Sequence, residues 1–286
     1  MPVNVLYCEG GKNTPDSRVL SNLLLGLEPK VRVRPVRTKY GLDRLIIFLK
    51  QEKNFGSNVT VAALKDRDFD RDDSSPQASP REWFAKDNDQ TIQVGWSWER
   101  KEIENYLVDP EVVQRALGSK APPIDDYRSA LEESAKAITD YTAARIALSL
   151  AQPSSLSLKN YWGNHGINKK HLFPEHLLES DCRDAIKNIV SEVEQSQTIQ
   201  EDCVLETFDQ LILTCRIGGC RFQDFLTFFS GKDLLYGMKT SLAEFSLGEP
   251  TAFLERVVKG IEDSSDVWSW LPEWNQLRQV VQQFSL

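Results

Sequence analysis

The segment AALKDRDFDRDD, residues 62–73, carries five aspartates within eight positions, directly behind the apolar run 59–64. Carboxylates this close together repel one another, and each would have a raised pKa unless a cation or a helix N-terminus neutralised it. Hard oxygen ligands suit Mg²⁺ or Mn²⁺, and the chain has no His or Cys set typical of zinc. Asp66 and Asp68 are the expected metal ligands, because a spacing of two on an extended chain points both side chains the same way. Asp70 is a weaker candidate.

A further acid follows the first predicted strand. The chain begins MPVNVLYCEGGKN, which places Glu9 after a short apolar run and before two glycines that let a backbone approach a ligand closely. In an open parallel sheet, ligands bind at the carboxyl ends of the strands. If the two strands are neighbours, Glu9 converges with the aspartates, and we expect it to bind metal or to act as a general acid or base.

Other interpretations of the aspartate segment remain open. An EF-hand loop also begins D-x-D-x-D, but it requires Gly at its sixth position and Glu at its twelfth, where this chain has Arg71 and Gln77. A phosphatase of the haloacid dehalogenase type carries D-x-D after a buried strand, but usually on the first strand and with Thr or Val where this chain has Asp70. The remaining alternative is a solvated acidic turn.

The elements that would position these acids alternate along the first hundred residues. Apolar patterns predict strands at 3–8, 31–36, 58–66 and 91–96, with helices at 14–27 and 42–52 between them. The second strand contains Pro35, which favours a sheet edge. The polar stretch 71–90 is expected to be a loop, and 103–118 a helix that ends at Gly118. This β-α-β-α-β order predicts an α/β fold with a parallel sheet flanked by helices.

The second half of the chain is predicted to be mainly helical. Helical periodicity covers 127–150, 174–195, 201–215, 222–229 and 251–261. We therefore expect a metal-binding domain at 1–118 and a helical assembly domain at 119–286. The helical half shows apolar stripes and a tryptophan-rich tail from Asp266 onward, which predict self-association or docking on a partner. The residues of one such stripe are Ile186, Ile189, Val190 and Val193.

Composition bounds the possible partners and the compartment. No apolar stretch approaches the ~20 residues of a membrane helix, and the N-terminus has no signal-peptide pattern, so we expect a cytoplasmic protein without membrane contact. The five cysteines contain no C-x-x-C pair, which argues against a disulfide framework or a zinc ribbon. The net charge of −8 is unusual for a protein that binds nucleic acid unaided. A separate partner is expected to bring it there.

The combination of YCEGGKN after one strand and LKDRDFD after the third resembles the TOPRIM domain, the metal-dependent unit of topoisomerases, primases and OLD-family nucleases. The resemblance covers roughly residues 3–110. It is strongest to small TOPRIM proteins encoded beside an ATPase, above all the effector subunit of PARIS-type anti-phage systems. The segments WERKEIENYL and FFSGKDLLYGM add to that likeness.

The resemblance implies a metal-dependent TOPRIM endonuclease that cleaves DNA or tRNA and acts as a toxic antiviral effector under the control of an ATPase subunit. Phosphodiester cleavage requires neutralised phosphoryl charge and an activated water, which Mg²⁺ or Mn²⁺ supplies. The resemblance implies that Glu9 is essential. Glu104, or less favourably Glu102, would add a ligand for a second metal, and Lys12 and Lys232 are candidate phosphate contacts. The main alternative is a non-catalytic TOPRIM-shaped subunit that only assembles a complex.

Overall fold

The computed structural model describes residues 2–36, 41–51, 60–67, 72, 74–88, 90–151, 184, 187–188, 191 and 201–284. The chain divides into two compact units. The larger comprises Met1–Thr142 and Thr214–Leu286, and the smaller comprises Ala143–Leu213. The domain boundary expected after residue 118 therefore lies within the larger unit.

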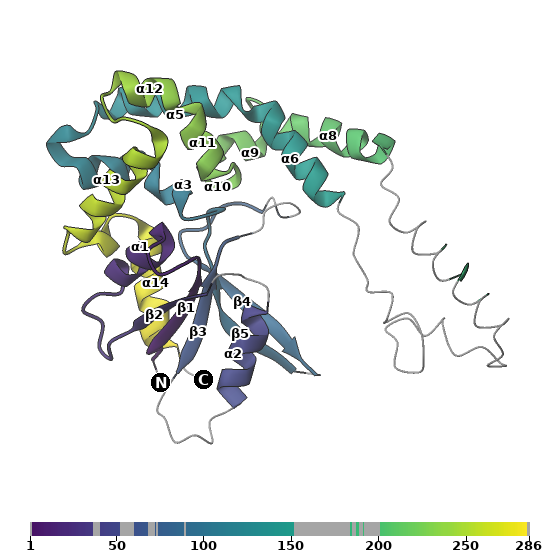
Figure 1. Ribbon diagram of the computed structural model, residues 1–286, viewed down its shortest axis with the longest axis vertical. Coiled ribbons are helices and arrows are strands. Elements are labelled where there is room, and N and C mark those ends of the chain that lie inside the picture. The colour runs from purple at the N-terminus through teal and green to yellow at the C-terminus, as the bar shows by residue number, and fades with distance from the viewer. Residues whose placement is uncertain are drawn as a thin grey trace. The chain divides into compact units, whose positions relative to one another are not determined.

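A five-stranded sheet is the centre of the larger unit, with the strand order β2-β1-β3-β5-β4 (Figure 1). The strands β2, β1, β3 and β5 are parallel, and only the edge strand β4 runs antiparallel to its neighbour. The α/β class with a mostly parallel sheet is thus confirmed. The strands are β1 (Val5–Glu9), β2 (Arg32–Val36), β3 (Val61–Lys65), β4 (Arg81–Asp87) and β5 (Gln90–Ser97).

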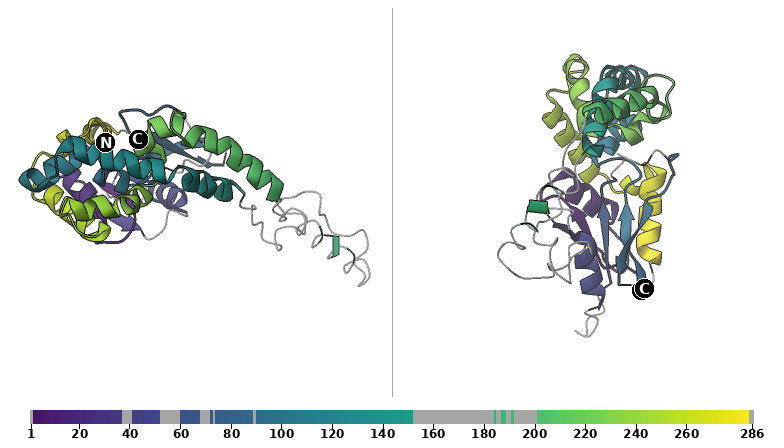
Figure 2. Two further views of the ribbon diagram at one scale, coloured as in Figure 1. Left: turned by 90° about the horizontal axis from the view of Figure 1, so that it is seen from above. Right: turned by 90° about the vertical axis from the view of Figure 1, so that its right-hand side faces the viewer.

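Helices cover both faces of this sheet. Figure 2 shows α2 (Leu42–Gln51) on one face and α14 (Pro272–Gln283) on the other. Helix α1 (Pro15–Leu23) begins as the sequence predicts, with Thr14 at the N-cap and a proline in its first turn. Under α2, Val5 and Tyr7 of β1 and Val61 and Ala63 of β3 pack with the helix in one apolar cluster. The two-residue alternation of strands puts their even-numbered residues on the opposite face.

The stretch 71–90 is not all loop, because residues Arg81–Asp87 form β4. Its side chains alternate between exposed and partly buried, and Trp83 and Ala85 pack against the α2 cluster. The strand is held by antiparallel pairing with β5. The apolar pattern did not reveal this edge strand because four of its seven residues are charged.

The single helix expected at 103–118 is instead two helices. Helix α3 (Glu104–Leu107) stops before Pro110, and α4 (Pro110–Leu117) starts there, with the Asp109 side chain accepting a hydrogen bond from the backbone of Glu111. Proline is favoured in a first helical turn and disrupts a helix interior, which explains the break. Gly118 follows α4 as expected.

Further helices complete the larger unit. They are η2 (Gly118–Lys120), α5 (Ile124–Ala137), α9 (Cys220–Gln223), α10 (Phe225–Phe228), α11 (Gly231–Gly237), α12 (Lys239–Glu244), α13 (Pro250–Glu262) and η4 (Val267–Ser269). Two further helices, α6 (Thr139–Leu150) and α8 (Glu201–Cys215), provide most of the described part of the smaller unit. The predicted stripe Ile186, Ile189, Val190 and Val193 lies outside the described residues, as does most of the helix expected at 174–195.

The tryptophan-rich tail is core, which corrects its expected role as a docking surface. Trp274 and Leu277 of α14 are fully buried, and the Trp270 side chain is 7% exposed. The Phe284 ring packs edge-on against Trp96 of β5, with 5.1 Å between ring centroids. These aromatic side chains are buried against other parts of the chain, so they are not available as anchors for a partner.

Candidate active site

Two acidic side chains meet at the carboxyl edge of the sheet, where β1 and β3 end. The parallel register pairs Cys8 with Leu64, so the chain leaves both strands at the same level. There the backbone N–H of Asp66 donates to the Glu9 carboxylate, with 3.2 Å between nitrogen and oxygen. The expected convergence of Glu9 and Asp66 is therefore observed.

A third acid, Asp16, comes from the first turn of α1. The turn between β1 and α1 depends on Gly10, whose φ of +91° is a conformation that side chains with a Cβ rarely adopt. A Cβ at Gly10 would lie 2.4 Å from the Thr14 hydroxyl and 3.4 Å from the Asp16 carboxylate. The glycine thus lets α1 start immediately after the strand, which keeps Asp16 at the acidic edge.

Helix α3 supplies two more acids, Glu102 just before it and Glu104 in it, and Asn105 fixes their position. The buried Asn105 amide donates to the carbonyl oxygens of Leu226 and Phe229 at 2.9 and 2.8 Å. Its oxygen accepts from the backbone N–H groups of Glu102 and Gly231, each at 3.2 Å. One side chain therefore ties α3 to the segment that enters α11.

The close contact between α3 and α11 brings Lys232 to these two acids. Gly231 lies so near α3 that a Cβ there would be 2.4 Å from the backbone nitrogen of Asn105. The Lys232 ammonium contacts Glu102 at 2.5 Å and Glu104 at 3.1 Å. Glu102 also accepts from the Ser230 hydroxyl at 2.8 Å. The carboxylate of Glu102 is thus more fully satisfied than that of Glu104.

Burial and mutual repulsion shift the pKa values of these acids. Burial, followed by the charges of Asp16, Glu9, Glu102 and Glu104, raises the pKa of Asp66 to about 8. Burial and the charge of Glu104 raise the pKa of Asp16 to about 6, although Lys232 opposes the shift. Asp66 therefore interacts electrostatically with four other carboxylates at this edge, and Lys232 is a cation that contacts two of these. The edge has an excess of negative charge that a cation would relieve.

The two α3 acids respond differently to the same lysine. Burial acts to raise the pKa of Glu102, but its ion pair and hydrogen bonds with Lys232 outweigh burial and lower it. Burial raises the pKa of Glu104, and Lys232 only partly opposes this. Glu104 is therefore the acid of the pair that is less neutralised by the protein, which agrees with the sequence preference for Glu104 over Glu102 as a ligand.

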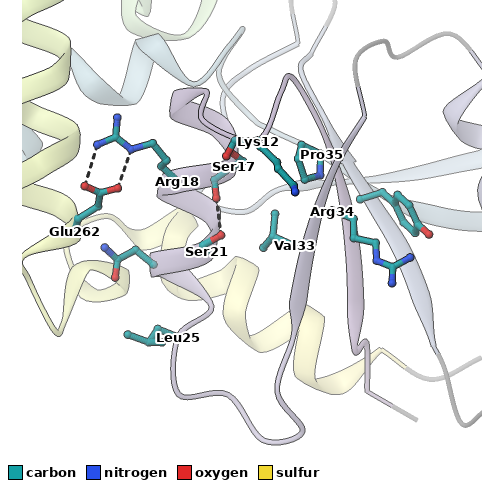
Figure 3. Close-up of a pocket in the computed structure, with 11 residues that line it drawn as sticks. Lys12, Ser17, Arg18, Ser21, Leu25, Val33, Arg34, Pro35 and Glu262 are labelled. Atoms are coloured by element: carbon teal, nitrogen blue, oxygen red, sulfur yellow. Dashed lines mark hydrogen bonds and ion pairs between the residues drawn. The ribbon is translucent and has the colours of Figure 1, made fainter.

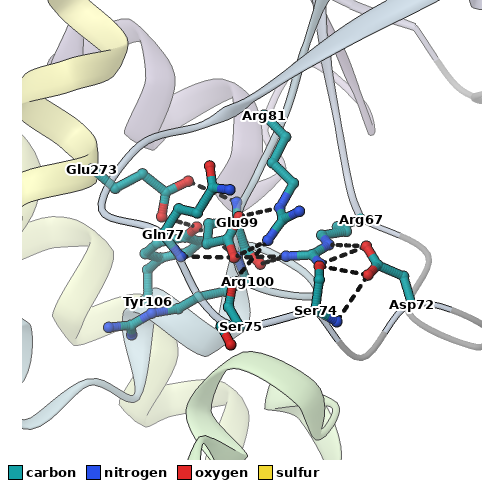
Figure 4. Close-up of polar contacts among 10 residues, drawn as sticks. All are labelled: Arg67, Asp72, Ser74, Ser75, Gln77, Arg81, Glu99, Arg100, Tyr106 and Glu273. Carbon is teal, nitrogen blue, oxygen red and sulfur yellow. Dashed lines mark hydrogen bonds and ion pairs between the residues drawn. The ribbon is translucent and has the colours of Figure 1, made fainter.

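The residue between Asp66 and Asp68 holds the strand end in place. Arg67 is buried and pairs with the Glu99 carboxylate at 2.7 Å and with Asp72 at 2.5 Å (Figure 4). Arg81 contacts the other oxygen of Glu99 at 2.6 Å. These ion pairs explain why the acidic segment contains Arg67. Arg67 ties the segment to Glu99, and Asp72 is the second ion-pair partner of Arg67.

The remaining predicted residues lie as follows. Lys12 is exposed and lines a cavity between α1 and β2, so the structure does not bring it into contact with the acids described above. Asp68 and Asp70 lie outside the described residues. Within the described part of the chain, no group of three or more His, Cys, Asp or Glu side chains is placed to hold one metal ion. The roles of all these residues stay predictions.

Sequence reasoning missed Asp16, Arg67 and Asn105. An aspartate in a first helical turn is common, because it interacts favourably with the helix dipole, so Asp16 gave no distinct signal. The available clue was the position of Asp16, which follows closely on the end of the first strand and on Gly10 and Gly11. Arg67 and Asn105 act through residues distant in sequence, and no local pattern identifies them.

Comparison with protein-family models and with curated proteins finds no match for this chain. In the part of the chain that the structure describes, no helix has both the length and the apolar character needed to cross a membrane.

Proposed function

We propose that this chain is a metal-dependent, TOPRIM-like endonuclease that hydrolyses phosphodiester bonds in DNA or tRNA. The observation that carries the proposal is the contact between Glu9 and Asp66 at the carboxyl edge of the sheet, with Asp16 and Glu104 close enough to raise the pKa of Asp66. An open parallel sheet binds its ligands at this edge. The resemblance of YCEGGKN and LKDRDFD to the TOPRIM motifs points to the same edge.

The donor set at this edge fits Mg²⁺ or Mn²⁺. The side chains are carboxylates, which are hard oxygen ligands. The nearby thiol of Cys8 is unsuited to metal binding, because burial and the surrounding acids raise its pKa to about 12 and keep it protonated. Asp66, with a pKa of about 8, would be largely protonated at neutral pH unless a cation replaced the proton. A divalent ion would supply positive charge to the phosphoryl group and make a water molecule more acidic.

The chain's own side chains have separable tasks in this proposal. Glu9 and Asp66 hold the metal, and Asp66 is oriented by the backbone hydrogen bond to Glu9. The side chain of Lys232 is 55% exposed. Although burial acts to lower its pKa, the charges of Glu104 and Glu102 raise it, so its ammonium stays charged. It can therefore donate to a phosphoryl oxygen as a fixed positive charge. Arg67 and Asn105 position these groups.

The biological role proposed is that of a toxic anti-phage effector held or activated by a separate ATPase subunit. This rests on the resemblance to PARIS effectors. The net charge of −8 supports a partner, because phosphate contacts dominate nucleic-acid affinity and an acidic chain makes few of them unaided.

The test is a cleavage assay with labelled tRNA and duplex DNA in Mg²⁺ or Mn²⁺, with the ATPase partner present. Glu9→Gln should reduce the cleavage rate at least ~100-fold, the scale of losing a group that acts in acid-base catalysis. The matched control is Glu82→Gln, at an exposed position of β4, which should leave the rate unchanged. Cleavage or cell toxicity that survives Glu9→Gln would instead favour the non-catalytic assembly subunit.

A further inference from the structure

A run of basic residues lies on and around the edge strand β2. Residues 29–42 contain five lysines and arginines and no Asp or Glu, although the whole chain has a net charge of −8. The side chains of Lys30, Arg32 and Arg34 are exposed. Arg37 and Lys39 continue the run but lie outside the described residues.

This strand leads to the acidic edge. β2 runs parallel to β1, and Val36 is in register with Glu9, so the carboxyl end of β2 lies at the same edge as Glu9 and Asp66. From Arg32 to Val36 the strand rises about 13 Å, at ~3.3 Å per residue. One strand of a duplex presents about four phosphates over such a length, at ~3.4 Å per phosphate.

A cavity of about 750 Å³ lies beside this strand, between α1 and β2 (Figure 3). Lys12 and Arg34 both line it, over an apolar wall that includes Val33 and Pro35. Arg18, on the α1 side, is engaged by Glu255 and Glu262, each at 2.7 Å.

Lys12 and Arg34, by contrast, form no ion pair with any carboxylate in the described residues. As far as the described residues go, the cavity therefore offers two positive charges without an ion-pair partner.

Protection of an edge strand is the alternative explanation, because charged side chains and proline discourage pairing with a second sheet. The opposite edge, β4, provides an internal comparison. Its exposed side chains are Glu82, Phe84 and Lys86, which mix both signs with an apolar residue. Protection of an edge strand therefore does not require charges of a single sign. The uniformly positive charges on β2 would suit an anionic ligand.

We infer that Lys12, Lys30, Arg32 and Arg34, here named the basic edge, bind the sugar-phosphate backbone of the nucleic-acid substrate beside the acidic site. The inference rests on the proposed nuclease function and adds the path that the substrate takes. The basic edge holds the flanking phosphates, and the carboxyl ends of β1 and β3 receive the scissile one. Because these contacts are to phosphates, they position the strand without reading its sequence.

The test measures binding of labelled tRNA and duplex DNA to the full-length chain at ~50 mM salt, where phosphate contacts are strongest. All proteins carry Asp66→Asn to prevent cleavage. Arg32→Gln with Arg34→Gln is compared with Lys86→Gln with Lys239→Gln, an equal loss of charge at exposed positions away from the basic edge. Melting curves confirm that both variants are folded.

We expect the basic-edge pair to weaken binding about tenfold and to reduce the slope of log affinity against log salt by about 1.5, as two lost phosphate contacts should. The control pair should change neither quantity. Equal losses in both variants, or none in either, would overturn the inference. The inference would also be overturned if Arg32→Gln with Arg34→Gln weakened binding to anionic lipid vesicles but left binding to nucleic acid unchanged.

Failure of the nuclease proposal has a different signature. If Glu9→Gln abolishes cleavage while the basic-edge pair binds normally, the nuclease stands and the substrate path is wrong. If the intact chain cleaves no nucleic acid but Arg32→Gln with Arg34→Gln still weakens binding, the basic edge does bind nucleic acid and the catalytic proposal is wrong.

Discussion

Asp66, Arg67 and Asp72 show how one short acidic segment divides its tasks residue by residue. Asp66 faces Glu9 at the carboxyl edge, whereas Arg67 is buried against Glu99 and takes Asp72 as a second partner. The crowding of aspartates in the sequence is therefore not one cluster with one purpose. Part of it builds the acidic edge, and part of it satisfies the arginine that holds that edge in place.

Replacing Asp66 with asparagine should abolish metal-dependent cleavage and leave the fold intact. The reason is that burial and the charges of Asp16 and Glu9 already favour the neutral form of Asp66 in the metal-free protein, and asparagine is neutral too. We expect the melting temperature in the absence of divalent ions to stay the same or rise. Circular dichroism melting checks this, and a variant that unfolds would show that Asp66 is structural.

Glu273 should make stability depend on pH. Burial raises its pKa to about 7, and the nearby charge of Glu99 adds to the rise, whereas hydrogen bonds from Tyr106 and the Glu99 backbone and the charge of Arg100 oppose it. The folded state thus favours the protonated acid. The stability this provides is complete below the ordinary pKa of about 4.5 and is lost as pH rises through about 7.

The corresponding measurement compares urea unfolding of the wild type and Glu273→Gln at pH 5 and pH 8. Glutamine stays neutral and keeps an oxygen for the Glu99 N–H, which lies 2.7 Å from Glu273. We expect the variant to gain on the order of 2 kcal/mol relative to the wild type between these pH values. A difference that is constant with pH would mean that Glu273 is ionised in the folded protein throughout this range.

At the scale of elements, the site depends on the junction between α3 and α11. Asn105 makes four hydrogen bonds there, two as donor and two as acceptor. Both helices are short, α3 having 4 residues and α11 having 7, so neither is stable by itself. Asn105 supports their relative position together with the contacts that Ser230 and Lys232 make with Glu102.

Asn105→Ala should lower the free energy of unfolding by about 3 kcal/mol, because several buried backbone groups lose their partner. It should also reduce cleavage, because Lys232 and Glu104 lose their common support. Asn22→Ala is a useful control, since that amide makes a single hydrogen bond to the Ile261 carbonyl at 2.8 Å. A loss for Asn105→Ala no larger than for Asn22→Ala would argue against the junction.

The sequence predicts the helices and strands that are determined by neighbouring residues. The cap and proline of α1 and the apolar runs of β1 and β3 are visible in a few neighbouring residues, and all three form as expected. β4 was missed because its burial comes from pairing with β5. Asn105 was missed for a related reason, because its partner Phe229 is 124 residues away. Contacts between distant segments leave no local pattern.

At the scale of the whole molecule, the distribution of charge matters more than its sum. The chain has a net charge of −8, yet residues 29–42, on and around β2, contain five lysines and arginines and no Asp or Glu. An acidic remainder would limit unspecific attraction to nucleic acid, and the basic edge would still orient a strand that the proposed ATPase partner delivers.

The isolated chain should consequently bind tRNA and duplex DNA weakly at ~150 mM salt, with a marked gain when the ATPase partner is added. Filter binding or fluorescence anisotropy with and without the partner measures this. Tight and strongly salt-dependent binding by the isolated chain would contradict the expected need for recruitment.

The central claim is that the acidic edge is a divalent-metal site, and calorimetric titration of the full chain with Mn²⁺ tests it most directly. The account predicts saturable binding to the wild type, at least a tenfold weaker affinity for Asp66→Asn, and unchanged affinity for Asp125→Asn, whose side chain is 90% exposed on α5. Loss of a ligand or of its support typically costs metal affinity on the order of 10- to 100-fold. Equal Mn²⁺ affinity in the wild type and Asp66→Asn, or no binding to the wild type, would contradict the account.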